Sequence, residues 1–298
     1  MTTYSLNSGL FIFGKENQVV ADPITALESV ARAGFRETEL LAEGEEWQSP
    51  AGHDTSNLRH ALDRLGIYAH TIHTPYMDVN LASPEREVRN TGIALVGDAM
   101  RFLSELGGRT AVVHPSGPPR SGEPPLSLDN IGARMEYAHG SVSELVKVAE
   151  ETGVRIALEN LPSHRVPYRP LESTQELRAF IADLPAEHVG ICLDVGHCLI
   201  SGYDPAGQAR IAAERLYALH LQDGDGRGDR HWVPGRGMID WPSMGSALLD
   251  IGFDGAWTIE VGVAHTDDPV EVIAADCAAV RELWEAKGLS ALGGTATG

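Results

Sequence analysis

The chain has 298 residues, of which 43% are hydrophobic and 22% charged, as in a soluble globular protein rather than a disordered or fibrous one. Its formal net charge of −19 disfavours nucleic acid as a partner, because that affinity comes largely from Lys and Arg side chains that neutralise phosphates. The three cysteines, Cys192, Cys198 and Cys277, form no zinc-finger or disulfide pattern, which is typical of a reducing compartment.

The N-terminal residues lack the basic start and long apolar core of a signal peptide. No apolar stretch approaches the ~20 residues that span a bilayer. We therefore expect a cytoplasmic protein with no membrane partner.

Along the chain, short β-branched runs alternate with longer amphipathic segments. The expected strands are one within residues 4–13 and others at 37–41, 67–72, 110–113, 155–158, 189–193, 216–219 and 257–259. The expected helices are 24–33, 57–65, 84–106, 128–152, 174–183, 205–213, 242–252 and 270–287. Several of these helices are followed by a glycine stop, as at Gly34, Gly66 and Gly153.

Eight successive strand–helix units predict a parallel sheet with crossover helices. A (β/α)8 barrel typically uses about 250 residues, so this length favours a closed barrel over an open sheet. We predict an α/β fold with a single (β/α)8 TIM barrel over residues 1–289 and a flexible Gly/Ala/Thr-rich tail over 290–298. No G-x-G-x-x-G follows the first strand and no Walker A sequence occurs, which disfavours a nucleotide-binding protein.

The ends of six consecutive strands carry imidazoles or carboxylates. The residues are His73, His114, Glu159, Asp194, His220 and Glu260. In a barrel these ends converge on one face, and buried carboxylates there are costly unless they are paired or bind a metal. One such histidine alone is more often a satisfied polar residue, but the group Glu159, Asp194, His220 and Glu260 predicts a divalent metal site.

Further polar residues lie near the same face. His73, His114, His197, Asp229 and His231 are candidates for additional metal ligands or for hydrogen bonds to a substrate.

Candidates for substrate contacts are Asn160, Arg230 and Trp232. Asn160 either orients Glu159 or binds a substrate hydroxyl, Arg230 could hold a phosphate, and Trp232 could stack on a sugar ring. Glu39, late in the second strand, either closes the ring of polar residues, contacts substrate or is structural.

Motifs across most of the chain resemble those of the xylose isomerase-like TIM barrel superfamily, which includes sugar phosphate isomerases and epimerases and also endonuclease IV. The matching segments are His73-Thr-Pro-Tyr, Val-Val-His114-Pro-Ser-Gly, Ala-Leu-Glu159-Asn160, Leu-Asp194-Val-Gly-His197, Leu-His220-Leu-Gln-Asp223, Asp229-Arg-His231 and Ile-Glu260.

The epimerase-like branch implies one divalent ion, Mn, Mg, Co or Zn, bound by Glu159, Asp194, His220 and Glu260. It also implies that Glu159 and Glu260 are the catalytic acid/base pair, with His197 in contact with the substrate. The expected function is a metal-dependent sugar, sugar phosphate or polyol isomerase or epimerase. Its carboxylates would move a proton next to a polarised carbonyl.

The endonuclease IV branch implies up to three zinc ions and an AP endonuclease activity. All nine matching ligand types are present: His73, His114, Glu159, Asp194, His197, His220, Asp229, His231 and Glu260. The negative charge and the acidic segment at residues 43–46 argue against DNA as the substrate. A keto-sugar lyase or dehydratase, a barrel that binds a ligand without turnover, and assembly into a homo-oligomer all stay open.

Overall fold

The computed structural model describes residues 3–15, 18–43, 55–77, 79–117, 122–162 and 169–288. The expected tail at 290–298 and most of the acidic loop after the second strand lie outside these residues. Within this part of the chain, no helix is both long and apolar enough to cross a membrane.

Eight parallel strands close into a barrel in sequence order, which confirms the predicted fold. They are β1 (Thr3–Asn7), β2 (Glu37–Leu41), β3 (Tyr68–His73), β4 (Thr110–Val113), β5 (Arg155–Glu159), β6 (Val189–Asp194), β7 (Leu216–Leu221) and β8 (Ala256–Ile259). β2 and β4 have the expected bounds, and β3 and β5 to β8 differ by one or two residues. β1 begins one residue before the expected window of 4–13 and ends at Asn7, because α1 occupies much of the rest of that window.

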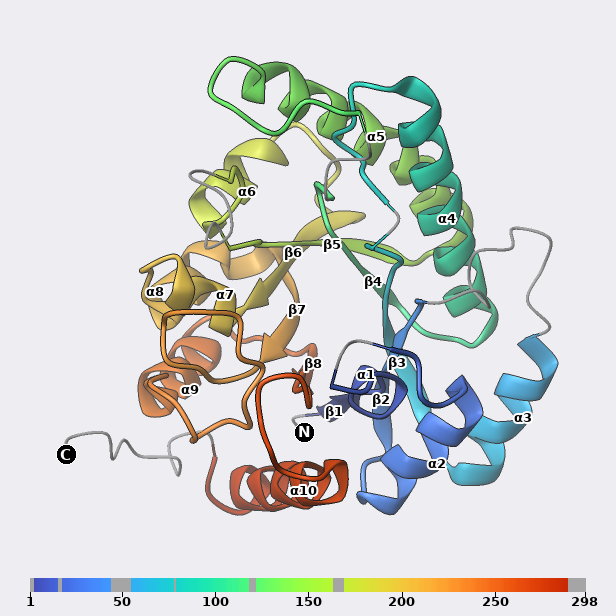
Figure 1. The fold of residues 1–298 in the computed structure, drawn as a ribbon, viewed down its shortest axis with the longest axis vertical. Coiled ribbons are helices and arrows are strands. Elements are labelled where there is room, and N and C mark those ends of the chain that lie inside the picture. The colour runs from blue at the N-terminus through green and yellow to red at the C-terminus, as the bar shows by residue number, and fades with distance from the viewer. Residues whose placement is uncertain are drawn as a thin grey trace.

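Helices surround this ring of strands (Figure 1). They are α1 (Gly9–Ile12), α2 (Pro23–Arg32), α3 (Thr55–Leu65), α4 (Arg86–Glu105), α5 (Ile131–Thr152), α6 (Thr174–Phe180), α7 (Val195–Ile200), α8 (Pro205–Ala212), α9 (Trp241–Asp250) and α10 (Val270–Lys287). Most of the buried apolar side chains pack between strands and helices in one large cluster.

Two short helices, α1 and α7, were not predicted. Each has too few turns to establish an apolar period. α7 begins directly at the end of β6, where the Asp194 carboxylate accepts a hydrogen bond from the His197 backbone N–H at 2.7 Å. This side chain thus caps the helix that carries His197.

Strand alternation points the site residues into the barrel. Side chains two residues apart on a strand share a face, so each residue two positions before a strand-end donor is also directed inward. These preceding residues are Thr71, Val112, Ala157, Cys192, Ala218 and Thr258. Four of them, Val112, Ala157, Cys192 and Ala218, belong to a small apolar cluster of their own. They form an apolar layer inside the barrel, beneath the polar groups at the carboxyl ends of the strands.

Candidate metal centre

Four donors from strands β5 to β8 form a compact set, here called the inner quartet: Glu159, Asp194, His220 and Glu260. One ligand atom from each lies within 4.8 Å of the others. His220 Nδ1 lies 3.0 Å from Glu260 Oε2 and 3.6 Å from Glu159 Oε1. The His220 ring is fully buried, and neither nitrogen has an aligned hydrogen bond to the described residues. A buried nitrogen facing carboxylates in this way is suited to bind a cation.

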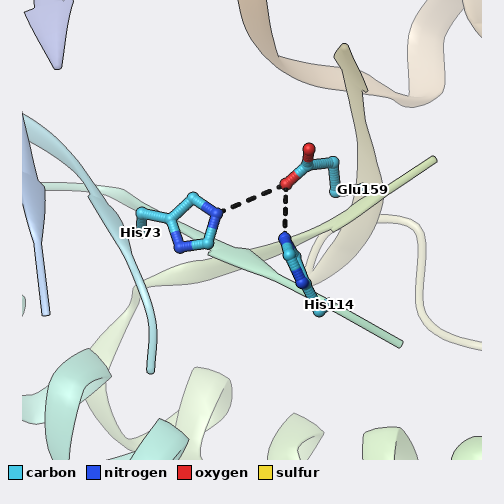
Figure 2. Close-up of side chains that lie close together, drawn as sticks. All are labelled: His73, His114 and Glu159. Atoms are coloured by element: carbon cyan, nitrogen blue, oxygen red, sulfur yellow. Dashed lines mark hydrogen bonds and ion pairs between the residues drawn. The ribbon is translucent and has the colours of Figure 1, made fainter. Parts of the chain in front are cut away.

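The second set consists of His73, His114 and Glu159 (Figure 2). Glu159 Oε2 lies 3.4 Å from His73 Nε2 and 3.1 Å from His114 Nε2. His73 Nδ1 lies 3.0 Å from the Thr74 carbonyl oxygen, to which its N–H donates. This bond makes Nε2 the ring nitrogen that faces Glu159 and that could exchange its proton for a cation. Glu159 is a member of two donor sets.

The third set, here called the rim group, consists of His197, Asp229 and His231. Asp229 lies 3.4 Å from His197 Nε2 and 3.1 Å from His231 Nε2. The Nδ1 atoms of the two histidines lie 2.8 Å and 3.3 Å from the carbonyl oxygens of Asn160 and Glu260. Metal-binding histidines usually donate their second ring N–H to such an acceptor, which fixes the tautomer. The described residues therefore fit divalent cations at this face of the barrel.

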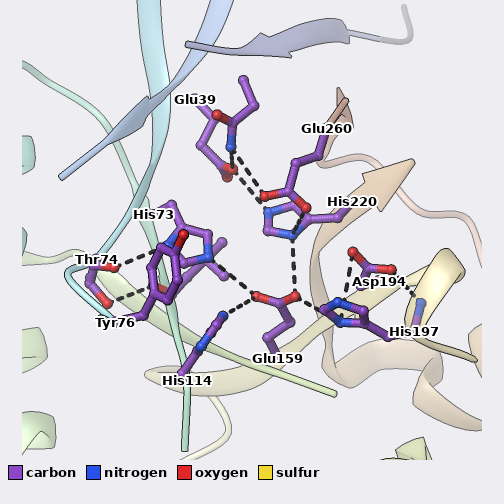
Figure 3. Close-up of polar contacts among 12 residues, drawn as sticks. Glu39, His73, Thr74, Tyr76, His114, Glu159, Asp194, His197, His220 and Glu260 are labelled. Carbon is purple, nitrogen blue, oxygen red and sulfur yellow. Dashed lines mark hydrogen bonds and ion pairs between the residues drawn. The ribbon is translucent and has the colours of Figure 1, made fainter. Parts of the chain in front are cut away.

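Glu159 lies at the centre of the whole arrangement (Figure 3). Imidazoles from β3, β7, α7 and the end of β4 surround it within 3.6 Å. Burial raises its pKa, but His114 and His220 outweigh that effect and hold the pKa well below its ordinary value. For His114, in contrast, burial outweighs the attraction of Glu159, and the pKa of the imidazole falls to about 4.

Charge compensation also determines the pKa values of the other donors. Burial raises the pKa of Glu260, yet His220 and His231 bring it down to about 2. Burial lowers the pKa of His231, but Asp229 and Glu260 raise it to about 10. For Asp194 burial prevails, and its pKa rises to about 6. The carboxylates thus require nearby positive charge, which protonated imidazoles or a divalent ion can supply.

A second layer of side chains supports the donors. Glu39 is completely buried, with Oε1 2.9 Å from His220 Nε2, and it accepts hydrogen bonds from Asn7 and Thr71. Of the roles open to Glu39, these contacts favour closing the polar ring behind His220. A carboxylate behind a ligating imidazole orients the ring and raises its basicity.

Sequence reasoning assigned no role to Asp223, which organises the loop between β7 and α9. Its buried carboxylate accepts hydrogen bonds from the backbone N–H groups of Gly224, Gly235 and Ile239 and from Nε1 of Trp241. The available signal was an aspartate directly after an apolar strand at the start of a Gly-rich loop.

A cavity of about 700 Å³ lies against the donors. Its polar wall includes members of all three sets, and its apolar wall includes Phe13, Tyr76 and Val261. Among the three candidates for substrate contact, Arg230 lines this cavity, whereas Asn160 and Trp232 are not among the described residues that line it.

The side chains of these three candidates already have protein partners. Asn160 bonds both the N–H and the carbonyl of Asp194, which ties β5 to β6. Trp232 Nε1 donates to the His265 carbonyl at 3.1 Å, and Arg230 pairs with Asp225 at 3.0 Å. For Asn160, the contacts favour the orienting role over a bond to a substrate hydroxyl.

The closed barrel and its clustered imidazoles and carboxylates define the protein as a TIM barrel with a candidate multi-donor metal centre. The chain belongs to the xylose isomerase-like TIM barrel family, whose model matches residues 27–283. This match confirms the resemblance that the motifs indicated.

The relatives of this chain include proteins named for two different activities. A D-psicose 3-epimerase from Ruminiclostridium cellulolyticum is 29% identical over 259 residues, covering 86% of this chain and 83% of the relative. A probable endonuclease 4 from Carboxydothermus hydrogenoformans is 29% identical over 184 residues, covering 55% of this chain and 59% of the relative. The crystal structure of a D-psicose 3-epimerase in the presence of D-fructose has the same fold, with a TM-score of 0.79 at 21% identity over 98% of this chain and 100% of that one.

Proposed function

We propose that this protein is a divalent-metal-dependent sugar epimerase or isomerase whose substrate is a free sugar, a sugar phosphate or a related polyol. The observation that carries the proposal is the inner quartet, which combines two glutamates with an aspartate and a buried histidine within 4.8 Å. Oxygen and imidazole donors of this kind suit Mn, Mg, Co or Zn. The similarity to D-psicose 3-epimerases supports the same reaction class.

Two glutamates of the quartet are suited to proton transfer. Glu159 and Glu260 both line the cavity, from β5 and from the end of β8. A bound divalent ion would supply Lewis acidity that polarises the sugar carbonyl and makes the adjacent C–H more acidic. With pKa values held below their ordinary range, both carboxylates are ionised at neutral pH and can accept that proton.

The stereochemical outcome depends on where the proton returns. One glutamate removes the proton from the carbon next to the carbonyl. Since both carboxylates start ionised, epimerisation follows when the other glutamate takes up a proton from solvent and delivers it to the opposite face of that carbon. Isomerisation follows when the proton is delivered to the former carbonyl carbon instead, while the proton of the adjacent hydroxyl moves to the former carbonyl oxygen.

Solvent exchange tests this proposal directly. The protein is incubated with Mn and a panel of ketoses, aldoses and their phosphates in deuterated water, and deuterium next to the carbonyl is measured by NMR. We expect incorporation with at least one sugar, and its loss in Glu159→Gln and Glu260→Gln. Glu151→Gln, on the exposed end of α5, is the matched control and should exchange like the wild type. Absence of exchange across the panel contradicts the proposal.

A zinc-dependent AP endonuclease is the second candidate, and one observation favours it. The nine donors form three sets, and Glu159 is shared between two of them. Up to three zinc ions could bind there. The net charge of −19 opposes DNA binding. Incubation with a duplex containing an abasic site distinguishes the two functions, because efficient strand cleavage would support the endonuclease.

A further inference from the structure

A buried glutamine connects the inner quartet to the rim group. Gln222 follows the last residue of β7 and is completely buried. Its Nε2 lies 2.9 Å from Asp194 Oδ2 and 3.3 Å from Asp229 Oδ1, and it donates to both oxygens. Its Oε1 accepts the backbone N–H of His231 at 2.9 Å. One amide therefore bonds one residue of the quartet and two of the rim group.

A glycine on α7, Gly196, leaves room for the Gln222 amide. Gly196 lies in the first turn of α7, and a Cβ added there would come within 2.4 Å of Gln222 Cδ. Only glycine leaves room for the glutamine against that turn. His197 is the next residue along α7, so the packing of Gln222 also bears on the remaining member of the rim group.

The backbone of His231 depends on the same contact. His231 has φ +49, a left-handed conformation that is uncommon for a residue with a side chain. Such a conformation is strained and persists only where neighbouring contacts hold it. Here the Gln222 amide accepts its N–H, and Gly262 donates its N–H to the His231 carbonyl at 3.0 Å.

From these contacts we infer that Gln222 is a positioning residue that holds His197, Asp229 and His231 as a second cation site beside the inner quartet. The inference rests on the proposed metal dependence of the protein. Both hydrogens and the oxygen of the amide are used, so no other side chain of this length makes the same contacts. A methionine fills similar space without hydrogen bonds, and a glutamate would place a carboxylate against Asp194 and Asp229.

Gln208 supplies a matched control on another part of the barrel. It is also buried, and it bonds the backbone and side chain of Thr174 and the side chain of Gln175. Gln208→Met removes a comparable amide bonded to α6 rather than to metal-donor residues.

The test is metal binding by the purified wild type, Gln222→Met, Gln222→Glu and Gln208→Met. Each protein is stripped of metal and titrated with Co²⁺, with equivalents counted by elemental analysis and geometry followed by visible absorption. We expect the wild type and Gln208→Met to bind more than one equivalent. In Gln222→Met, the tight first equivalent should stay and affinity for the next should fall by about 10- to 100-fold. Circular dichroism and thermal unfolding identify any variant that fails to fold, and Gln222→Glu then provides the second substitution at this position.

The outcomes separate this inference from the proposed function. Unchanged Co²⁺ binding in both Gln222 variants overturns the positioning role, as does a wild type that binds only one equivalent. Either result leaves a single-metal epimerase intact. A wild type that binds no metal overturns the proposed function itself.

Discussion

The inner quartet and the rim group contain similar donors but are positioned in different ways. All four residues of the quartet lie at strand ends, where the parallel ladders set their places, as in the pairing of Asp194 with His220. Two of the three rim residues lie on the loop between β7 and α9. The Asp229 and His231 side chains are 23% and 28% exposed, against 0% for His220.

This difference shows that a loop requires its own framework to hold ligands. Backbone hydrogen bonds of the barrel set the places of the quartet residues, and buried side chains such as Glu39 and Asn160 support them. The loop that carries two rim residues has an isolated antiparallel bridge, between Asp223 and Trp232, and depends further on side-chain bonds from Gln222 and Asp223. The quartet should therefore tolerate changes in the loop, whereas the rim group should not.

The largest effect on metal binding is expected at Glu159, which two donor sets share. Glu159→Gln replaces a carboxylate that belongs to both the quartet and the His73–His114 set. Metal affinity should fall by more than about 100-fold, beyond the usual loss for a supporting residue, because a direct ligand is removed. Elemental analysis after dialysis measures this loss. Retention of wild-type metal content would mean that Glu159 is not a ligand.

A smaller effect, confined to the loop, is expected for Asp223→Asn. The carboxylate now accepts hydrogen bonds from four N–H groups, and the new amide would place its own N–H groups against some of them. The free energy of unfolding should therefore fall by about 2–4 kcal/mol. Denaturant unfolding measures the change, and metal titration should show loss of the rim site with the quartet retained.

Asp240→Asn is the control for that substitution. Asp240 caps α9 through the N–H of Ser243 and is exposed. An asparagine still caps a helix, so the cost should stay below about 1 kcal/mol. Equal losses for Asp223→Asn and Asp240→Asn would contradict the organising role of Asp223.

Metal binding by the rim group should also depend on pH. In the metal-free protein, the raised pKa of His231, about 10, keeps its imidazole protonated at neutral pH. Since this pKa exceeds the unfolded value, its contribution to stability is fully present below pH 6.5 and is lost as the pH rises through about 10.

Metal binding must displace that proton, so affinity at the rim should rise by about tenfold per pH unit for each proton released. Calorimetric titrations in buffers of different protonation enthalpy count these protons. His231→Ala should release fewer than the wild type, and an identical count would exclude His231 as a rim ligand.

The smallest effect is expected at the cavity edge. Arg230 lines the cavity, is half-buried and is paired with Asp225. Arg230→Gln should leave metal content and folding unchanged and raise KM for a sugar phosphate more than for the corresponding free sugar. Equal changes in KM for both substrates would show that Arg230 does not bind the phosphate.

The amino-acid sequence alone determined the eight strand–helix units and the donors at the strand ends. Alternation with a period of two and glycine stops are local signals, so β2 and β4 could be predicted to the residue. Because the carboxyl ends of the strands of a barrel converge on one face, the six strand-end donors could be predicted to lie together there.

Tertiary structure decided how nine donors divide into three sets, and why Glu159 joins two of them. Those groupings depend on strand register and barrel closure, which bring together residues such as His114 and Glu159 that are 45 positions apart. The contacts of Glu39 behind His220 and of Gln222 between quartet and rim have the same origin. A side chain's neighbours across a closed barrel cannot be derived from its own stretch of chain, because they are set by the packing of all eight units.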